Sequence, residues 1–157
     1  MTSYWLMKSE PHVYSWENLV DDGSTHWDGV RNYQARNIMR DEMKLGDKVL
    51  FYHSNCKPPH VAGVARVCKE SYPDFTAIDP SSKYFDPKSS PENPRWMMVD
   101  IESLAGLKNV SFPDLRNNDD LEGMPLLKRG QRLSVQPVNR KHFEIVCKMG
   151  GLNGIPQ

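Results

Sequence analysis

Val49-Leu50-Phe51-Tyr52 and Val61-Ala62-Gly63-Val64-Ala65-Arg66-Val67 are the two stretches that decide the fold. Both are short apolar runs rich in β-branched and aromatic residues, which is typical of buried strands. Residues 55–59 between them contain two prolines and form a turn. Two buried strands joined by so short a turn predict an antiparallel hairpin at the centre of the protein.

Three further apolar runs and four helical segments surround this hairpin. The further strands are expected at residues 4–8, 96–101 and 133–135. Helices are expected at residues 15–20 with Ser15 as N-cap and Gly23 as stop, at 34–44, at 112–116, and at 139–149 with Asn139 as N-cap. Residues 73–94 contain five prolines and little periodicity, so we expect a long irregular segment there. Five strands with short helices between them predict an α+β domain built on a strongly curved sheet or small barrel.

The composition describes one ordinary globular domain with no bulk charge. The 157 residues fit a single domain that spans residues 1–157. Twenty basic and twenty acidic side chains cancel, so binding to nucleic acid would require a local patch and a pocket. Three widely spaced cysteines indicate free thiols in a reducing compartment, and neither a signal peptide nor a membrane-spanning run is visible. We therefore expect a cytoplasmic monomer, or a nuclear one in a eukaryotic source, with no membrane partner.

The familiar catalytic and cofactor motifs are missing from the sequence. No G-x-S-x-G turn is present, and neither of the common glycine-rich phosphate loops occurs. The five histidines are dispersed and form no metal-binding pair, and the adjacent carboxylates Asp21-Asp22 and Asp119-Asp120 lie in polar turns. The sequence therefore predicts a protein that is not an enzyme and that needs no cofactor or metal.

Aromatic residues alternate with polar ones in a way that is typical of a base-binding protein. The aromatic members are Trp5, Trp16, Trp27, Trp96, Tyr4, Tyr33, Tyr52 and Tyr72. The polar residues among them are Lys8, Ser9, Arg31, Asn32, His53, Ser54 and Asp74. Aromatic faces can sandwich a base while Ser, Asn and Asp read its edge. Arg31 and Lys8 would then hold flanking phosphates, or else they form surface ion pairs.

The tryptophans also have structural interpretations. Trp16 lies on a short helix beside apolar neighbours, which favours the core. Trp5 and Trp96 lie in expected strands, so one face of each is expected in the core. Trp27 lies between two polar residues in a stretch without regular period, which favours a pocket wall.

Three long strings of residues resemble the signature runs of the EVE domain family. They are Tyr4-Trp5-Leu6-Met7-Lys8-Ser9-Glu10-Pro11, Trp27-Asp28-Gly29-Val30-Arg31-Asn32-Tyr33-Gln34-Ala35-Arg36-Asn37 and Phe51-Tyr52-His53-Ser54-Asn55-Cys56-Lys57. Shorter matches occur at residues 70–74, 93–96 and 132–138, so the resemblance extends from Tyr4 to about Met149. Strings of this length in the right order are far more specific than a single motif.

The resemblance implies a PUA-like fold, a five-stranded pseudo-barrel with short helices around it, related to the YTH readers of methylated adenine in RNA. It also implies a reader that flips a modified base into a pocket without catalysis. The implied base is a modified cytosine, such as 5-methylcytosine or 5-hydroxymethylcytosine, and the implied partner is DNA in preference to RNA. Glu10-Pro11 departs from the YTH pattern, so specificity for methyladenine is not implied.

The resemblance assigns roles to particular positions. Lys8-Ser9 would contact the base, Trp27 would form one wall of the pocket, and Tyr72, Phe51 or Tyr52 would form the other. The predicted pocket as a whole comprises Ser9, Glu10, Trp27, Val30, Asn32, Tyr33, Phe51, Tyr52, His53, Tyr72 and Asp74. The predicted phosphate contacts are Lys8, Arg31, Ser54, Lys57 and Arg95. An alternative is an RNA- or nucleotide-processing enzyme of the ASCH type, another PUA-like group, with Lys8, Glu10 or His53 as acid, base or orienting group.

Overall fold

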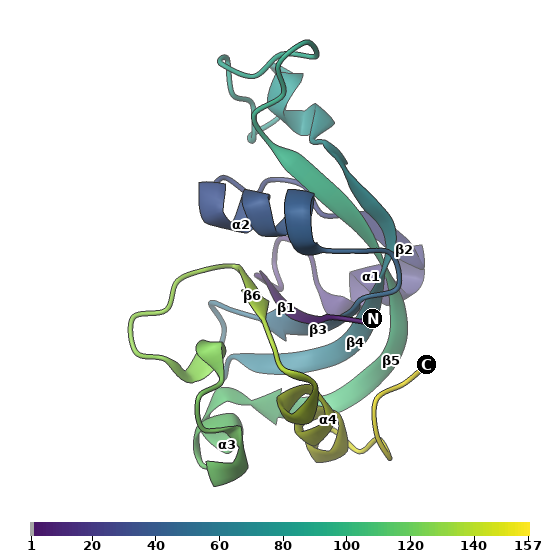
Figure 1. The fold of residues 1–157 in the computed structure, drawn as a ribbon, viewed down its shortest axis with the longest axis vertical. Helices are drawn as coiled ribbons and strands as arrows, with labels where there is room; N and C mark the ends of the chain where they lie inside the picture. The colour runs from purple at the N-terminus through teal and green to yellow at the C-terminus, as the bar shows by residue number, and fades with distance from the viewer. Residues whose placement is uncertain (1) are drawn as a thin grey trace.

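The computed structural model describes residues 2–157, and its central feature is a curved six-stranded sheet (Figure 1). In chain order the strands are β1 (Tyr4–Ser9), β2 (Ser24–His26), β3 (Lys48–His53), β4 (His60–Pro73), β5 (Met97–Ser111) and β6 (Val135–Pro137). Across the sheet the order is β2-β5-β4-β3-β1-β6, and all neighbours are antiparallel except β1 and β3. The sheet is open, with β2 and β6 at its edges.

The predicted central hairpin is confirmed as the pair β3 and β4. Val49 lies opposite Ala65 and Leu50 lies opposite Val64, and all four residues are fully buried. Beyond the hairpin, β4 and β5 are longer than predicted and pair along most of their length, with register shifts at four places that bend the strands. The two strands extend as an arm that carries the irregular 74–96 segment away from the body of the protein (Figure 1).

Other strand predictions need correction. The sequence does not indicate β2, because Ser24–His26 is short and polar; it is an edge strand that pairs with β5. The strand expected at residues 133–135 begins at Val135 and continues to Pro137, and Trp96 precedes β5 without belonging to it. The curved α+β sheet is confirmed, but it has six strands instead of five and does not close into a barrel.

The helices mostly begin and end where the capping residues predict. They are α1 (Trp16–Asp22), α2 (Tyr33–Asn37), α3 (Phe112–Arg116) and α4 (Arg140–Met149), with 3-10 turns at Phe75–Ile78, Asp119–Leu121 and Pro125–Leu127. Ser15 and Asn139 cap α1 and α4 as predicted, and Gly23 ends α1 at a φ of +79° that favours glycine. The single helix expected at residues 34–44 is instead α2 followed by a π-helical turn, Ile38–Glu42.

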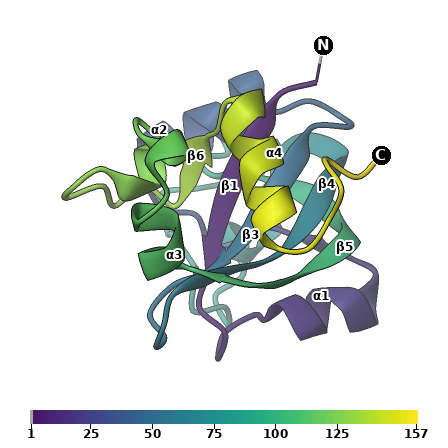
Figure 2. The ribbon, with the colours of Figure 1, turned by 90° about the horizontal axis from the view of Figure 1, so that it is seen from below.

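The two faces of the sheet carry separate apolar clusters, because alternate residues of a strand point to opposite faces. Met7 and Phe51 belong to one cluster, together with side chains from α1 and α2. Leu6 and Leu50 belong to the other, which α3 and α4 cover (Figures 1 and 2). Two residues that follow each other at the end of a strand therefore lie on different faces of the sheet, next to different apolar clusters.

Residues 2–157 contain neither a candidate metal centre nor a helix that could span a membrane. In this part of the chain, no three His, Cys, Asp or Glu side chains gather closely enough to hold a metal ion. No described helix is long and apolar enough to cross a bilayer. Cys56, Cys68 and Cys147 are free thiols, as the sequence predicts.

Candidate nucleic-acid interface

The C-terminal ends of β1 and β3 bring five of the predicted site residues together. In the parallel register of these strands, Lys8 lies opposite Tyr52 and Ser9 lies opposite His53. Ser54 follows directly, and its N–H donates to the Ser9 carbonyl oxygen at 3.0 Å. The parallel pairing thus joins two signature strings that are far apart along the chain.

Strand alternation divides these residues between the two faces of the sheet. Ser9 and His53 lie on the face that α1 covers, where the N–H of Trp16 donates to His53 Nε2 at 3.0 Å. Lys8 and Tyr52 lie on the opposite face, which α3 covers. The predicted residues therefore do not line a single cavity.

Trp27 and Phe51, both predicted as pocket walls, are packed into the core. Their rings meet edge to face, with centroids 5.5 Å apart and planes at 90°, and Trp27 is only 8% exposed. Trp16 is also buried against Phe51, at 5.5 Å, as the sequence predicts for a structural tryptophan. Trp27 therefore packs in the core and leaves little of its surface exposed.

His53 lies in a chain of hydrogen bonds that occupies both of its ring nitrogens. Its Nε2 accepts from Trp16, so its Nδ1 carries the proton and meets His60 Nε2 at 3.1 Å. His60 Nδ1 in turn donates to the Pro58 carbonyl oxygen at 2.9 Å. Burial and then the neighbouring His60 lower the pKa of His53, which favours the neutral ring. This arrangement suits a structural role better than proton transfer.

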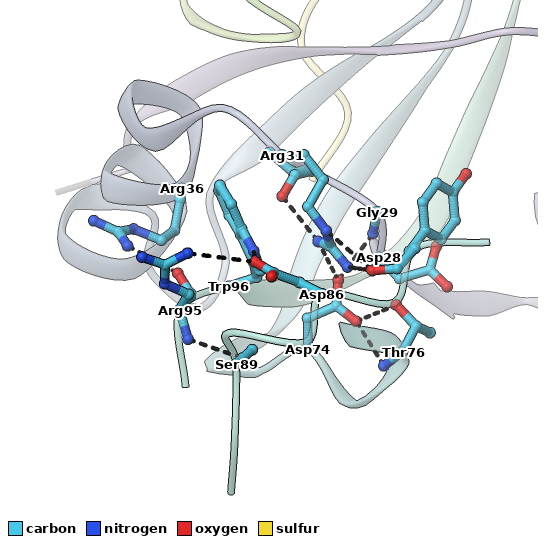
Figure 3. A network of polar contacts seen from close by, with 12 residues as sticks. Asp28, Gly29, Arg31, Arg36, Asp74, Thr76, Asp86, Ser89, Arg95 and Trp96 are labelled. Atoms are coloured by element: carbon cyan, nitrogen blue, oxygen red, sulfur yellow. Dashed lines mark hydrogen bonds and ion pairs between the residues drawn. The ribbon is translucent and has the colours of Figure 1, made fainter. Parts of the chain in front are cut away.

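An ion pair between the partly exposed Arg31 and the fully buried Asp74 fastens two distant loops to each other. Arg31 Nη1 and Asp74 Oδ2 are 3.0 Å apart, and the same oxygen accepts from the N–H of Gly29 at 2.9 Å (Figure 3). The other carboxylate oxygen accepts from the N–H of Thr76 at 2.8 Å. Burial raises the pKa of Asp74, but the hydrogen bonds from Thr76, Gly29 and Arg31 outweigh it and hold that pKa below its usual value.

Both members of this pair, which the sequence predicts as base and phosphate contacts, have partners within the protein. The Asp74 side chain is fully buried with both oxygens occupied. Arg31 also donates to the carbonyl oxygens of Tyr84 at 2.7 Å and Val30 at 3.0 Å, and Val30 itself is buried. Sequence reasoning missed this role because Asp74 and Tyr84 reach Arg31 only through the β4–β5 arm.

An aromatic stack next to the ion pair exposes Tyr33 at the surface. Tyr33 is 48% exposed and stacks on Trp96 with centroids 4.8 Å apart and planes at 17°. The Arg36 guanidinium lies 4.6 Å from the Tyr33 ring centroid and donates to the Arg95 carbonyl oxygen at 2.8 Å. The Trp96 indole N–H donates to Asp86 at 2.7 Å, and Arg95 pairs with the same carboxylate at 3.7 Å (Figure 3). The sequence did not single out Arg36 or Asp86.

Three further predicted residues take local positions. Asn32 accepts from the N–H of Ala35 at 3.0 Å and so caps α2. The Tyr72 hydroxyl donates to Asp100 on the neighbouring strand of the arm. Lys57 is exposed in the turn between β3 and β4.

A basic hollow of about 490 Å³ lies on the face to which Lys8 and Tyr52 point. The turn between β3 and β4, α3 and the 126–131 segment form its walls. Arg116, Lys128 and Arg129 also line it, and with Lys8 they make four cations in a lining without acids. Sequence patterns do not group these three cations with Lys8, because Arg116 reaches the hollow from α3 and Lys128 and Arg129 from a turn, all much later in the chain.

Comparison with known families and structures identifies relatives of this chain. The EVE domain model matches residues 3–149. Thymocyte nuclear protein 1 of Homo sapiens is 41% identical over 169 residues, which cover 95% of this chain and 74% of that protein. A hypothetical protein from Leishmania major has a similar structure, with a TM-score of 0.90 and 46% identity over 96% of this chain and 95% of that one. The crystal structure of human THYN1 in complex with DNA containing 5-methylcytosine has a TM-score of 0.87 and 40% identity, over 97% of this chain and 99% of that one.

A more distant likeness concerns the ASCH group. An ASCH protein from Zymomonas mobilis has a TM-score of 0.54 at 7% identity, over 94% of this chain and 98% of that one. At such low identity the likeness shows a shared fold alone. The family match over nearly all the chain and the relatives at about 40% identity decide the assignment: the chain belongs to the EVE domain family.

Proposed function

We propose that this chain is a reader of modified cytosine in DNA that works by binding alone. The observation that carries the proposal is the likeness to human THYN1, which was crystallised with DNA containing 5-methylcytosine. That protein has the same fold and 40% identity over 97% of this chain, including the region of the three signature strings. Similarity at this level supports a similar ligand far better than the shared fold would.

The end of β1 is the proposed position of the extruded base. Ser9 and Trp27 belong to one side of the sheet, while Lys8 points to the other. Adjacent strand residues send their side chains to opposite faces of the sheet. A nucleic-acid strand that passes over this strand end would therefore meet Ser9 with the extruded base and Lys8 with a phosphate.

Binding of this kind requires that contacts to the base offset the cost of unstacking it. Flipping costs a few kcal/mol, and stacking with edge hydrogen bonds must recover that cost. The 5-methyl group adds about 0.8 kcal/mol when it is fully buried, which corresponds to about fourfold in affinity. Because the net charge is zero, long-range attraction to DNA is limited and the pocket must supply the selectivity.

The contacts of the candidate catalytic groups favour a reader over an ASCH-like enzyme. Both ring nitrogens of His53 are engaged, so the ring has no free lone pair for a substrate. Glu10 Oε2 accepts from Asn55 Nδ2 at 3.0 Å and lies 3.1 Å from His12 Nε2, so this oxygen already has two partners. Incubation with modified nucleosides and RNA, with and without divalent metals, is expected to yield no product; turnover that His53→Gln abolishes would favour the enzyme.

Titration of labelled duplexes that differ at one central base tests the proposed function. The set carries cytosine, 5-methylcytosine, 5-hydroxymethylcytosine or thymine at that position, and thymine isolates the contribution of the base edge because it also has a 5-methyl group. We expect the modified cytosines to bind about fourfold or more tightly than cytosine and more tightly than thymine. Trp27→Phe, which keeps an aromatic ring in the core, is expected to reduce this preference. Equal affinity for all four duplexes would contradict the proposal.

A further inference from the structure

The basic hollow beside β1 concentrates positive charge that the protein itself does not neutralise. Lys8, Arg116, Lys128 and Arg129 line it, and among the residues that the structure describes none of the four forms an ion pair. Glu10 lies near the rim, where its carboxylate accepts from Asn55 Nδ2 at 3.0 Å. In a chain with equal numbers of acidic and basic residues, such a cluster is a local feature and not a consequence of net charge.

Backbone hydrogen bonds between distant segments fix the relative positions of the walls of the hollow. The N–H of Phe112 on α3 donates to the Pro59 carbonyl oxygen at 2.8 Å, which joins two of its walls. The N–H of Lys8 donates to the Ser134 carbonyl oxygen at 2.9 Å and ties its floor to the segment before β6.

A tight turn presents two of the cations. The N–H of Gln131 donates to the Lys128 carbonyl oxygen at 3.1 Å, and Gly130 has a φ of +77° at the position where such a turn favours glycine. Lys128 and Arg129 therefore project from the first half of a backbone turn whose shape is fixed by its own hydrogen bond. The turn therefore determines where the backbone presents Lys128 and Arg129.

A bound anion would stabilise the charged form of Lys8, which lines the hollow together with Tyr52. Lys8 is half-buried, and burial lowers its pKa because the charged ammonium loses water without gaining a carboxylate. A phosphate oxygen would offset that loss by a charge-assisted hydrogen bond. The Tyr52 hydroxyl has no hydrogen-bond partner within the described chain and lines the same space, so it is available to a ligand.

The lining of the hollow combines apolar, polar and basic groups, and this combination favours one class of anion over another. Tyr52 and Phe112 give the hollow an apolar side, and Ser54 and Gln131 add polar groups beside the cations. Such a surface fits the alternation of apolar sugar and charged phosphate along a nucleic-acid strand better than a small inorganic anion. By contrast, a neighbouring hollow of about 700 Å³ has three aspartates in its lining and does not suit a phosphate.

We propose that this hollow binds consecutive phosphates of the DNA strand, with Arg116, Lys128 and Arg129 as contacts in addition to Lys8. The inference rests on the proposed function in that DNA is the ligand, but it does not require that the base be modified. It separates two tasks: the basic hollow attracts and positions the strand, while the groups on the other face of β1 distinguish the base.

The salt dependence of binding tests this inference. Arg116→Gln, Lys128→Gln and Arg129→Gln, singly and together, are compared with wild type on duplexes with cytosine or 5-methylcytosine over a range of NaCl concentrations. All three side chains are exposed, so the fold should survive, and Lys44→Gln on an exposed lysine elsewhere is the matched control. Each lost phosphate contact is expected to reduce the slope of log K against log[NaCl] by about 0.9, and the triple variant by about 2 to 3.

The expected loss is equal for both duplexes, and Glu10→Gln is expected to tighten binding to both because it removes the rim acid. A triple variant with the salt slope of wild type and of Lys44→Gln would overturn the inference. The two proposals can fail separately. Equal binding to cytosine and 5-methylcytosine with a reduced slope in the triple variant would contradict the reader function alone; an intact preference with an unchanged slope would contradict the phosphate site alone.

Discussion

Gly63 is a residue of β4 that packs directly against the Trp16 ring. A Cβ atom at this position would lie 2.4 Å from the indole carbons, which is impossible without displacing the ring or the strand. We expect Gly63→Ala to lower the free energy of unfolding by about 1 to 3 kcal/mol, because overpacking a core forces such shifts. Urea unfolding monitored by tryptophan fluorescence measures the loss.

Gly106 provides the matched control on the next strand. A Cβ there would lie 3.5 Å from Trp16 Nε1, which is ordinary van der Waals contact, so Gly106→Ala should change stability little. Equal losses for both variants would contradict the assignment of the cost to the Trp16 contact.

His53 makes stability depend on pH. Its pKa in the folded protein lies below the ordinary value of 6.5, so the unfolded chain takes up this proton first as the pH falls. The free energy of unfolding is therefore expected to be highest above about pH 6.5 and to decrease as the pH drops below it. Urea unfolding between pH 7.5 and pH 5 tests this, and His53→Gln should flatten the slope while His12→Gln, at an exposed position, should not.

At the scale of elements, the Arg31–Asp74 pair holds the β4–β5 arm against the loop before α2. Asp74→Asn would leave the partly exposed Arg31 charge without its carboxylate, and a pair buried on one side only should cost about 2 kcal/mol, between the values for surface and fully buried pairs. We expect Asp74→Asn to destabilise the fold by about that amount and to increase amide hydrogen exchange in the 74–96 segment.

The surface pair between Arg66 and Glu102 is the control for this prediction. Both side chains are about one-third exposed, so Glu102→Gln should cost less than about 1 kcal/mol. An Asp74→Asn variant as stable as Glu102→Gln would show that the Arg31–Asp74 pair does not fasten the arm.

Local signals in the sequence predict the elements well where one residue decides the outcome. Ser15 and Asn139 precede helices that they cap, and the apolar runs of β1, β3 and β4 are strands as predicted. Asn32 also precedes a helix, and by the same reasoning it could have been assigned as a cap. The edge strand β2 could not be predicted, because three polar residues carry no periodicity and depend on β5 for their structure.

The candidate site could be predicted less completely, for two physical reasons. Alternation within β1 sends Lys8 and Ser9 to opposite faces, so residues adjacent in a signature string do not share a cavity. The partners of Asp74 and the other cations of the basic hollow come from distant segments, whose approach only the tertiary structure defines. Residue type indicates which side chains are polar, but not which of them form hydrogen bonds or ion pairs within the folded protein.

At the scale of the whole molecule, the formal net charge is zero, but basic and acidic side chains gather in different places. The basic hollow lies beside the strand end where the base is proposed to bind, and the neighbouring hollow near α3 is lined by aspartates. Attraction to DNA is therefore expected to be short-ranged and directed to one face. This arrangement allows weak general binding to position the strand while base contacts determine selectivity.

The most direct test of the central claim is a fluorescence titration with two duplexes that differ by one methyl group. Each contains 2-aminopurine next to a central cytosine or 5-methylcytosine, so that extrusion of the central base unstacks the probe and raises its emission. We predict a larger rise and about fourfold or tighter binding for the 5-methylcytosine duplex, with the difference reduced in Trp27→Phe. Identical affinity and no rise in emission for either duplex would contradict a reader that extrudes a modified cytosine.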